Sequence, residues 1–165
     1  VPTHLLGTHT LRSHISVIPQ EPVLFSGTIR SNLDPFNEHS DEVLLKALAD
    51  VQLKDLTESM GNGLYSVVTE DGGNLSIGQK QLFCLCRAIL SHNKILIMDE
   101  ATANVDNKTD QLISSTLRQL FTDCTILTIV STDAVVTLGC AWQVMWAKDC
   151  TCGIDYRIVC EVHTM

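Results

Sequence analysis

The stretch from Asn74 to Asp106 constrains the fold more than any other part of this chain of 165 residues. Ser76 precedes a run of apolar residues at helical spacing, and Gln79 follows it three positions later, which is the pattern of a capping box. The run therefore predicts a helix from about Ile77 to Ser91. The unbroken apolar segment from Ile95 to Met98 then predicts a strand buried on both faces, as in a parallel sheet.

The residues on either side of this helix and strand are suited to phosphate chemistry. Two carboxylates, Asp99 and Glu100, directly follow the predicted strand, and ligands of open α/β sheets bind at the carboxyl ends of strands. Asp99 can hold Mg²⁺ through water, and Glu100 can orient or deprotonate an attacking water. The helix start offers free N–H groups to a phosphate; Ser76 adds a hydroxyl, and Gly78 lets the backbone come close.

Several motifs, in this order and spacing, resemble those of ABC-transporter ATPases. LSIGQ, Leu75 to Gln79, resembles the signature motif. ILIMDE, Ile95 to Glu100, resembles the Walker B motif with its catalytic glutamate, and ANVD, Ala103 to Asp106, resembles the D-loop. VIPQEPVLFSGTIRSNLDPF resembles the Q-loop region of subfamily C, the multidrug-resistance-associated proteins. With NEHSDE and EATANVD, it indicates the C-terminal part of a second nucleotide-binding domain.

The resemblance implies a fold class and a division of the chain. The fold is α/β, a partial P-loop NTPase-type (ABC ATPase) fold in which a parallel-sheet layer carries a small helical subdomain. Residues 11–130 are expected to form the partial ABC nucleotide-binding domain, with the helical subdomain at about 33–90. Residues 131–165 are expected to be a divergent C-terminal tail.

Cap residues and apolar periodicity predict elements on both sides of the central stretch. Phe25 to Pro35 is expected to be turn-rich. The helix after Asp106, with Asp106 as its N-cap, is expected to bury Ile113, Leu117 and Leu120. The predicted strands are Ile15 to Ile18, Thr125 to Val130 and a late one near Trp142 to Met145, and the other predicted helices are Ser40 to Val51 and Leu53 to Ser59.

The resemblance also implies ligands, partners and the roles of individual residues. ATP and Mg²⁺ are the implied cofactors, and the second nucleotide-binding domain and the transmembrane domains of the same transporter are the implied partners. The residues expected to act on the ATP of this domain are Gln20 and Asp99, which would hold Mg²⁺ through water, and the catalytic Glu100. The residues expected to complete the ATP site of the facing domain are Ser76, Gly78 and Gln79. Asp106 stands in the D-loop, a role compatible with its N-cap position.

Three features depart from the family's pattern. The sequence contains no G-x-x-x-x-G-K-[ST] motif, so we expect the fold to lack the Walker A strand and helix, and the chain alone to bind ATP weakly. TIVS places Ser131 where the family has a histidine, and a serine cannot repeat that role without a bridging water. Ile77 stands where many relatives have glycine, so Gly78 is expected to approach the phosphate. The isolated chain is therefore expected to be inactive.

Composition narrows the classes of partner. A net charge of −8 argues against a nucleic-acid partner and against broad binding to anionic membranes. The longest apolar stretch, Ala134 to Ala147, is shorter than the ~20 residues that a spanning helix needs. The chain is therefore expected to lie on the cytoplasmic side of a membrane only as part of a transporter. Cys84 and Cys86 are expected to be core residues in a reduced setting.

Two functions remain open at this point. The first is a fragment of a transporter's nucleotide-binding domain, with ATP binding and hydrolysis coupled to export of organic anions or drugs. The alternative is a truncated, non-hydrolysing product that acts as an interaction module or has no function. In the tail, the cysteines from Cys140 to Cys160, with His163, allow a metal site or an altered end of the reading frame. Poor ligand spacing favours the second interpretation.

Overall fold

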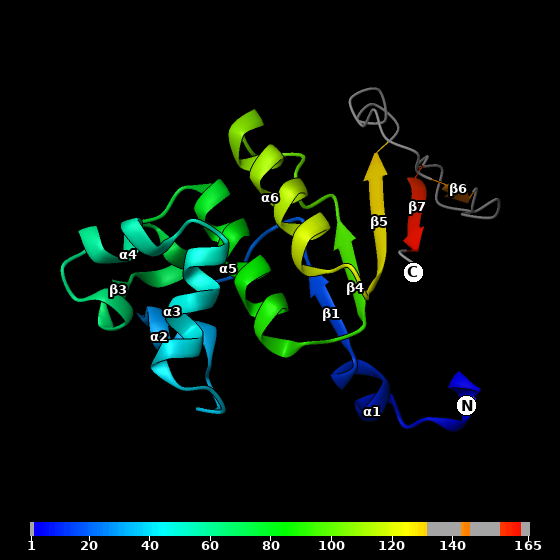
Figure 1. Ribbon diagram of the computed structural model, residues 1–165, viewed down its shortest axis with the longest axis horizontal. Helices are drawn as coiled ribbons and strands as arrows, with labels where there is room; N and C mark the ends of the chain where they lie inside the picture. Colours follow the sequence, from blue (N-terminus) through cyan, green and yellow to red (C-terminus); the bar gives the residue numbers. More distant parts are fainter. Residues whose placement is uncertain (1, 132–142, 146–155, 163–165) are drawn as a thin grey trace.

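The computed structural model describes residues 2–131, 143–145 and 156–162. Figure 1 shows a group of short helices on one side of a long helix, α5, and a sheet on its other side. The sheet has the strand order β1-β4-β5-β7-β6. Its strands are β1 (Ile15–Ile18), β4 (Ile95–Asp99), β5 (Thr125–Ser131), β6 (Gln143–Met145) and β7 (Tyr156–Val162).

The first three strands of the sheet are parallel, as predicted. In the register of β1, β4 and β5, Ile18 lies opposite Met98, and Met98 lies opposite Thr128. β7 runs the other way, because it pairs antiparallel with β5, and β6, which pairs antiparallel with β7, runs in the same direction as β5. The carboxyl ends of β1, β4 and β5 therefore meet at one edge of the sheet, where ligands of α/β proteins bind.

Helix α5 (Ile77–Ser91) confirms the prediction from the capping box. The Gln79 N–H donates to the hydroxyl of Ser76 at 3.2 Å, and the Ser76 N–H donates to the Gln79 side-chain oxygen at 2.9 Å. Both donors would otherwise be unpaired at the helix start. The helix ends at His92, whose φ of 50° is in the left-handed region that closes many helices.

The helices on the far side of α5 are short and surround a common core. The prediction that Phe25 to Pro35 is turn-rich was wrong in part, because Thr28 and Ser31 form a second capping box that starts a one-turn helix there. The predicted helices that follow are confirmed. The elements of this group are β2 (Gly27–Thr28), α2 (Ile29–Leu33), α3 (Asp41–Asp50), α4 (Lys54–Ser59), η2 (Gly63–Tyr65), β3 (Val67–Val68) and η3 (Glu70–Gly72).

The parallel strands are fully buried on one face only. In β4, Leu96 and Met98 are buried, whereas Ile95 and Ile97 on the opposite face are half-buried. Val17 of β1, which pairs with Ile97, is 57% exposed. Helix α5 packs on β1 of this sheet, and helix α6 (Asn107–Leu120) packs on α5 (Figure 1). The expectation of a strand buried on both faces was therefore wrong for the second face.

Helix α6 begins as predicted and buries a slightly different set of residues. Asp106 is its N-cap, and Ile113 and Leu117 are buried, but Leu120 is 44% exposed. Thr116, which was not predicted to be buried, is 3% exposed. Two elements near the N-terminus were not predicted, η1 (Thr3–Leu5) and α1 (Thr8–Ser13).

Candidate functional site

The carboxyl ends of β1 and β4 bring together two residues that lie far apart in the sequence. Gln20 follows β1 after Pro19, and Glu100 directly follows β4. The side-chain amide of Gln20 donates to Glu100 Oε2 at 2.7 Å. This is a short hydrogen bond from an amide to a carboxylate, a pairing that is stronger than one between two neutral groups. The contact joins the predicted Q-loop glutamine to the predicted catalytic glutamate.

The backbone of Glu100 has a conformation that is costly for a residue with a side chain. Its φ is 44°, in the left-handed region, which costs a non-glycine residue about 1 kcal/mol. The Glu100 N–H donates to the carbonyl of Ile129 in β5 at 2.9 Å, and this bond holds the turn. Strained backbone of this kind concentrates at functional sites, so the conformation is consistent with a carboxylate held in a required direction.

Asp99 is available to a cation. It is the last residue of β4 and pairs in register with Ile129. Its side chain is exposed, and within the described residues its carboxylate has no hydrogen bond or ion pair. Together with the amide oxygen of Gln20, it offers oxygen ligands of the kind that Mg²⁺ prefers. The residues at this edge of the sheet therefore fit a magnesium ion.

The signature residues lie at the start of α5. Ser76 and Gln79 are both engaged in the capping box described above. Gly78 is buried in the first turn, and a Cβ built on it would lie 3.0 Å from Oγ1 and 3.1 Å from Cγ2 of Thr109 in α6. The glycine therefore lets α5 and α6 approach closely. Its expected approach to a phosphate stays a prediction.

Asp106, the predicted D-loop residue, is fixed by the residues that it caps. Its carboxylate accepts from the hydroxyl of Thr109 at 2.8 Å and from the N–H groups of Lys108 and Thr109 at 3.1 and 3.2 Å. The hydroxyl of Thr109, followed by its N–H, lowers the pKa of Asp106 below its ordinary value. Thr109 thus binds Asp106 and at the same time packs on Gly78, which links the start of α6 to the start of α5.

We expect Gly78→Ala to lower the stability of the chain by about 1 kcal/mol. The added methyl would overpack against Thr109, a cost of roughly 1–3 kcal/mol, which exceeds the gain of up to ~1 kcal/mol in helix propensity. Thr109 cannot easily yield, because its hydroxyl is bonded to Asp106. Urea unfolding measures the change. Gly73→Ala is the matched control, because its Cβ would meet only ordinary contacts, with Thr69 Oγ1 at 3.4 Å and the carbonyl of Glu70 at 3.5 Å.

The partner variant Thr109→Ala isolates the contact. In that background Gly78→Ala should be neutral or stabilising, so that the two changes are coupled in a double-mutant cycle. A loss of stability equal in both backgrounds would show that the added methyl is resisted by something other than Thr109.

Two residues of α5 that the sequence did not single out hold the segment after β1. Gln81 is buried, at 1% exposure, and its amide donates to the carbonyls of Pro19 and Gln20. Arg87 donates to the carbonyl of Val23 and to both the carbonyl and the side-chain oxygen of Asn32. The only signal in the sequence for this role was that Gln81 is a polar residue at a position of the apolar stripe of α5.

The two cysteines of α5, Cys84 and Cys86, are not suited to catalysis or metal binding. Cys84 and Cys86 are buried, which confirms the expectation that they are core residues. Burial raises the pKa of the Cys86 thiol to about 12 and raises that of Cys84 above its ordinary value, so both are protonated at neutral pH. Across residues 2–131 and the described strands of the tail, no group of three metal-binding side chains occurs. Most of the tail's cysteines, and His163, lie outside the described residues.

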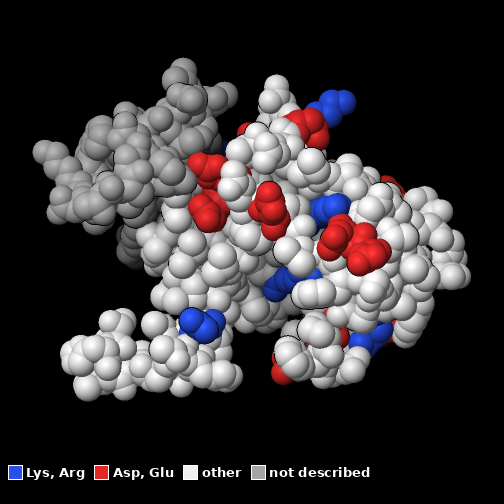
Figure 2. All heavy atoms as spheres, turned by 180° about the vertical axis from the view of Figure 1, so that it is seen from behind, with Lys and Arg blue, Asp and Glu red and all other residues white. Residues whose placement is uncertain are grey.

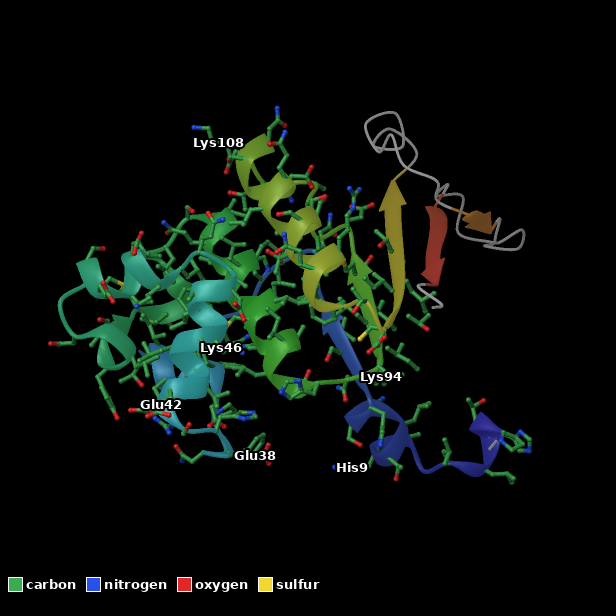
Figure 3. The ribbon with its side chains drawn as sticks, viewed as in Figure 1. His9, Glu38, Glu42, Lys46, Lys94 and Lys108 are labelled. Atoms are coloured by element: carbon green, nitrogen blue, oxygen red, sulfur yellow. The ribbon has the colours of Figure 1, made fainter. Side chains whose placement is uncertain are left out.

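A separate cavity of about 640 Å³ lies at the opposite end of the strands. Its lining includes Lys46 of α3, Lys94 just before β4, and Phe121 after α6. Figure 3 shows Lys46 and Lys94 on the side of the molecule away from Lys108, which stands in the first turn of α6. The carboxyl ends of α5 and α6 border this cavity. The cavity is therefore not part of the site at Gln20 and Glu100.

The described residues form no large basic patch on the face shown in Figure 2. Figure 2 shows several groups of acidic side chains on the rear face, with basic side chains scattered between them in the described part of the chain. The absence of a nucleic-acid partner stays a prediction. No helix within the described residues is long and apolar enough to cross a membrane.

The fold is α/β, a partial P-loop NTPase-type fold. Its parallel strands β1 and β4 lead into Gln20 and into Asp99–Glu100, and the capped helix α5 lies beside them. Residues 3–103 match the ABC transporter family, and the chain belongs to this family. Over 127 residues it is 59% identical to the probable multidrug resistance-associated protein lethal(2)03659 of Drosophila melanogaster, a match that covers 77% of the chain and 9% of the relative.

Two human relatives place the chain in subfamily C. It is 57% identical over 124 residues to ATP-binding cassette sub-family C member 4, covering 75% of the chain and 9% of the relative. It is 55% identical over 124 residues to sub-family C member 2, covering 75% of the chain and 8% of the relative. The resemblance to the multidrug-resistance-associated proteins is thus confirmed, and the chain spans less than a tenth of the length of these relatives.

Proposed function

We propose that this chain is a fragment of a transporter's nucleotide-binding domain, and that the whole protein couples ATP hydrolysis to the export of organic anions or drugs. The observation that carries the proposal is the 2.7 Å hydrogen bond between Gln20 and Glu100 at the carboxyl ends of two parallel strands. The position of these two side chains supports the proposal, because ligands of α/β proteins bind at this edge of the sheet. The 57% identity to a subfamily C protein supports it as well.

Each residue of this edge has a proposed role. Asp99 and Gln20 hold Mg²⁺ through water, and the ion when bound neutralises charge on the phosphates of ATP. Glu100 orients the attacking water and accepts its proton, a role that its strained backbone and its bond to Gln20 support. Asp99 is free of other partners among the described residues, which leaves its carboxylate for the ion.

The signature end of α5 is proposed to act on a second site. Ser76, Gly78 and Gln79 complete the ATP site of the facing nucleotide-binding domain, with Asp106 in the D-loop beside them. The close packing of Gly78 on Thr109, which binds Asp106, supports a joint role for the two motifs.

On this proposal residues 11–130 are the nucleotide-binding part, with a helical subdomain at about 33–90, and 131–165 are the tail. The partners are the second nucleotide-binding domain and the transmembrane domains, on the cytoplasmic side of the membrane.

A chimeric transporter tests the function. Residues 11–130 would replace the matching segment of human sub-family C member 4, to which the chain is 57% identical, and inside-out membrane vesicles would be assayed for ATP-dependent uptake of a fluorescent organic anion. We expect uptake within about tenfold of the parent, because a tenfold loss corresponds to only ~1.4 kcal/mol of barrier. The same chimera with Asp99→Asn should show no ATP-dependent uptake.

Controls separate folding from function in this experiment. Surface expression and binding of a fluorescent ATP analogue would be measured for every chimera. A chimera that reaches the membrane and binds nucleotide, yet neither hydrolyses ATP nor transports, would contradict the proposal. That outcome would favour a non-hydrolysing interaction module instead.

A further inference from the structure

We propose that Gln81 is a positioning residue that ties the Q-loop backbone to the signature helix and thereby holds Gln20 against Glu100. The inference rests on the proposed function for its meaning, since Gln20 and Glu100 are the proposed ATP-site residues. Its physical content is a contact network that can be measured in the absence of nucleotide. Failure of the positioning role of Gln81 is therefore distinguishable from failure of the proposed transporter function.

The contacts of Gln81 are specific. The side chain is 1% exposed and lies in the second turn of α5. Its Nε2 donates to the carbonyl of Pro19 at 3.1 Å and to the carbonyl of Gln20 at 3.0 Å. Both partners are pure acceptors, so the amide nitrogen must face them and the orientation of the side chain is unambiguous. The amide thus binds two successive carbonyls of the segment that leaves β1.

The cost of placing an amide here indicates that the contact matters. Gln81 lies on the apolar face of α5, beside Leu82 and Leu85, which are buried in the core. Its Oε1 atom is buried and has no hydrogen-bond partner within the described residues. An unpaired buried acceptor is unfavourable, and an apolar side chain of the same size would avoid it. The two bonds made by Nε2 are what an apolar residue could not supply.

The network continues to the proposed catalytic carboxylate. Gln20 is exposed, so its side chain would be free to adopt several rotamers unless its backbone were held. Gln81 fixes the backbone carbonyl of Gln20, and the side chain of Gln20 then donates to Glu100 Oε2 at 2.7 Å. A displacement of α5 would therefore shift Gln20 relative to Glu100, which is fixed to β5 through its own N–H.

A second tie on the same helix holds the other end of the segment. Arg87 Nη1 donates to the carbonyl of Val23 at 2.8 Å, and Arg87 Nε donates to the carbonyl of Asn32 at 2.8 Å. The segment from Pro19 to Val23 is thus anchored to α5 at both ends. The helix that starts with the signature motif and the loop that carries Gln20 are connected by side chains rather than by sequence proximity, since Gln81 and Gln20 are 61 positions apart.

Hydrogen exchange of glutamine side chains, measured by NMR on the full chain labelled with ¹⁵N-glutamine, tests the proposal. In the unmodified chain, the side-chain NH₂ of Gln81 should exchange with solvent at least about tenfold more slowly than that of Gln119, which is exposed on α6. The NH₂ of Gln20 should lie between the two. Exchange of Gln81 at the rate of Gln119 would overturn the proposal without any variant.

Two variants on α5 separate positioning from mere stability. Gln81→Met keeps the size of the side chain but removes both donors, and should raise the exchange of the Gln20 NH₂ at least about tenfold, towards the rate of Gln119. Phe83→Leu is the matched control, because Phe83 is fully buried on the same helix and makes neither bond. It should lower stability and leave the exchange of Gln20 unchanged. An equal rise in both variants, or in neither, would contradict a positioning role.

Discussion

Glu100→Gln is expected to lower ATP turnover by the chimeric transporter by roughly 10²–10⁴-fold, the contribution of a positioned acid–base group. Nucleotide binding should persist, because the proposed Mg²⁺ ligands Gln20 and Asp99 are untouched. The site should also keep its shape: the carbonyl oxygen of a glutamine can still accept from the Gln20 amide, which donates to Glu100 at 2.7 Å. Only the ability to take a proton from water is removed.

The measurement is phosphate release at saturating ATP, with nucleotide occupancy measured in parallel. Glu42→Gln is the matched control, because Glu42 is an exposed carboxylate in the first turn of α3 (Figure 3). That variant should turn over at the parent rate. If Glu100→Gln hydrolysed ATP within about threefold of the parent while Asp99→Asn did not, the base would be another group, and Glu100 would serve only to hold Gln20.

The elements that local sequence predicts are those whose signals are complete within a few residues. The capping box at Ser76 and Gln79 predicted the start of α5, and the apolar run before Asp99 predicted β4; both are confirmed. The same logic failed at Phe25 to Pro35, where turn-forming residues also serve as helix caps. A residue such as Thr28 favours both structures, and the contacts of α2 decide between them.

The geometry of the candidate site could be predicted only in part. That Gln20 and Glu100 lie near each other follows from the parallel order of β1 and β4, which the resemblance implied. Their hydrogen bond and the left-handed backbone of Glu100 do not follow, because they depend on β5 and on α5. The closeness of Gly78 to Thr109 does not follow from the sequence either, because it depends on how α5 and α6 pack.

The end of β5 carries the residue that departs from the family's histidine. Ser131 is the last residue of β5 and pairs with Tyr156 of β7. It thus stands at the same edge of the sheet as Gln20 and Glu100, as expected for the residue at that place in the motif. No sequence motif predicted β7, because this part of the chain matches no known motif and only the alternation of apolar residues could indicate a strand. The strand β5 with which β7 pairs is also not adjacent in the sequence.

Arg87→Met is expected to destabilise the isolated chain by about 2–4 kcal/mol, a larger loss of stability than that expected for Gly78→Ala. The guanidinium donates three hydrogen bonds, to Val23 and twice to Asn32, and bonds to charged groups contribute roughly 1.5–3 kcal/mol each before non-additivity. Asn32 is buried at 4% exposure. Its carbonyl would therefore lose a partner that water cannot easily replace.

Urea unfolding with a constant m value measures the loss. Arg87→Lys should recover no more than about half of it, because an ammonium group is a compact donor that cannot span the carbonyls of Val23 and Asn32 as a planar guanidinium does. Arg12→Met, at an exposed position of α1, controls for the loss of one positive charge from a chain of net charge −8 and should change stability by less than about 0.5 kcal/mol. Equal stability of the Lys and Arg forms would show that charge, and not the forked geometry of Arg87, holds the segment to α5.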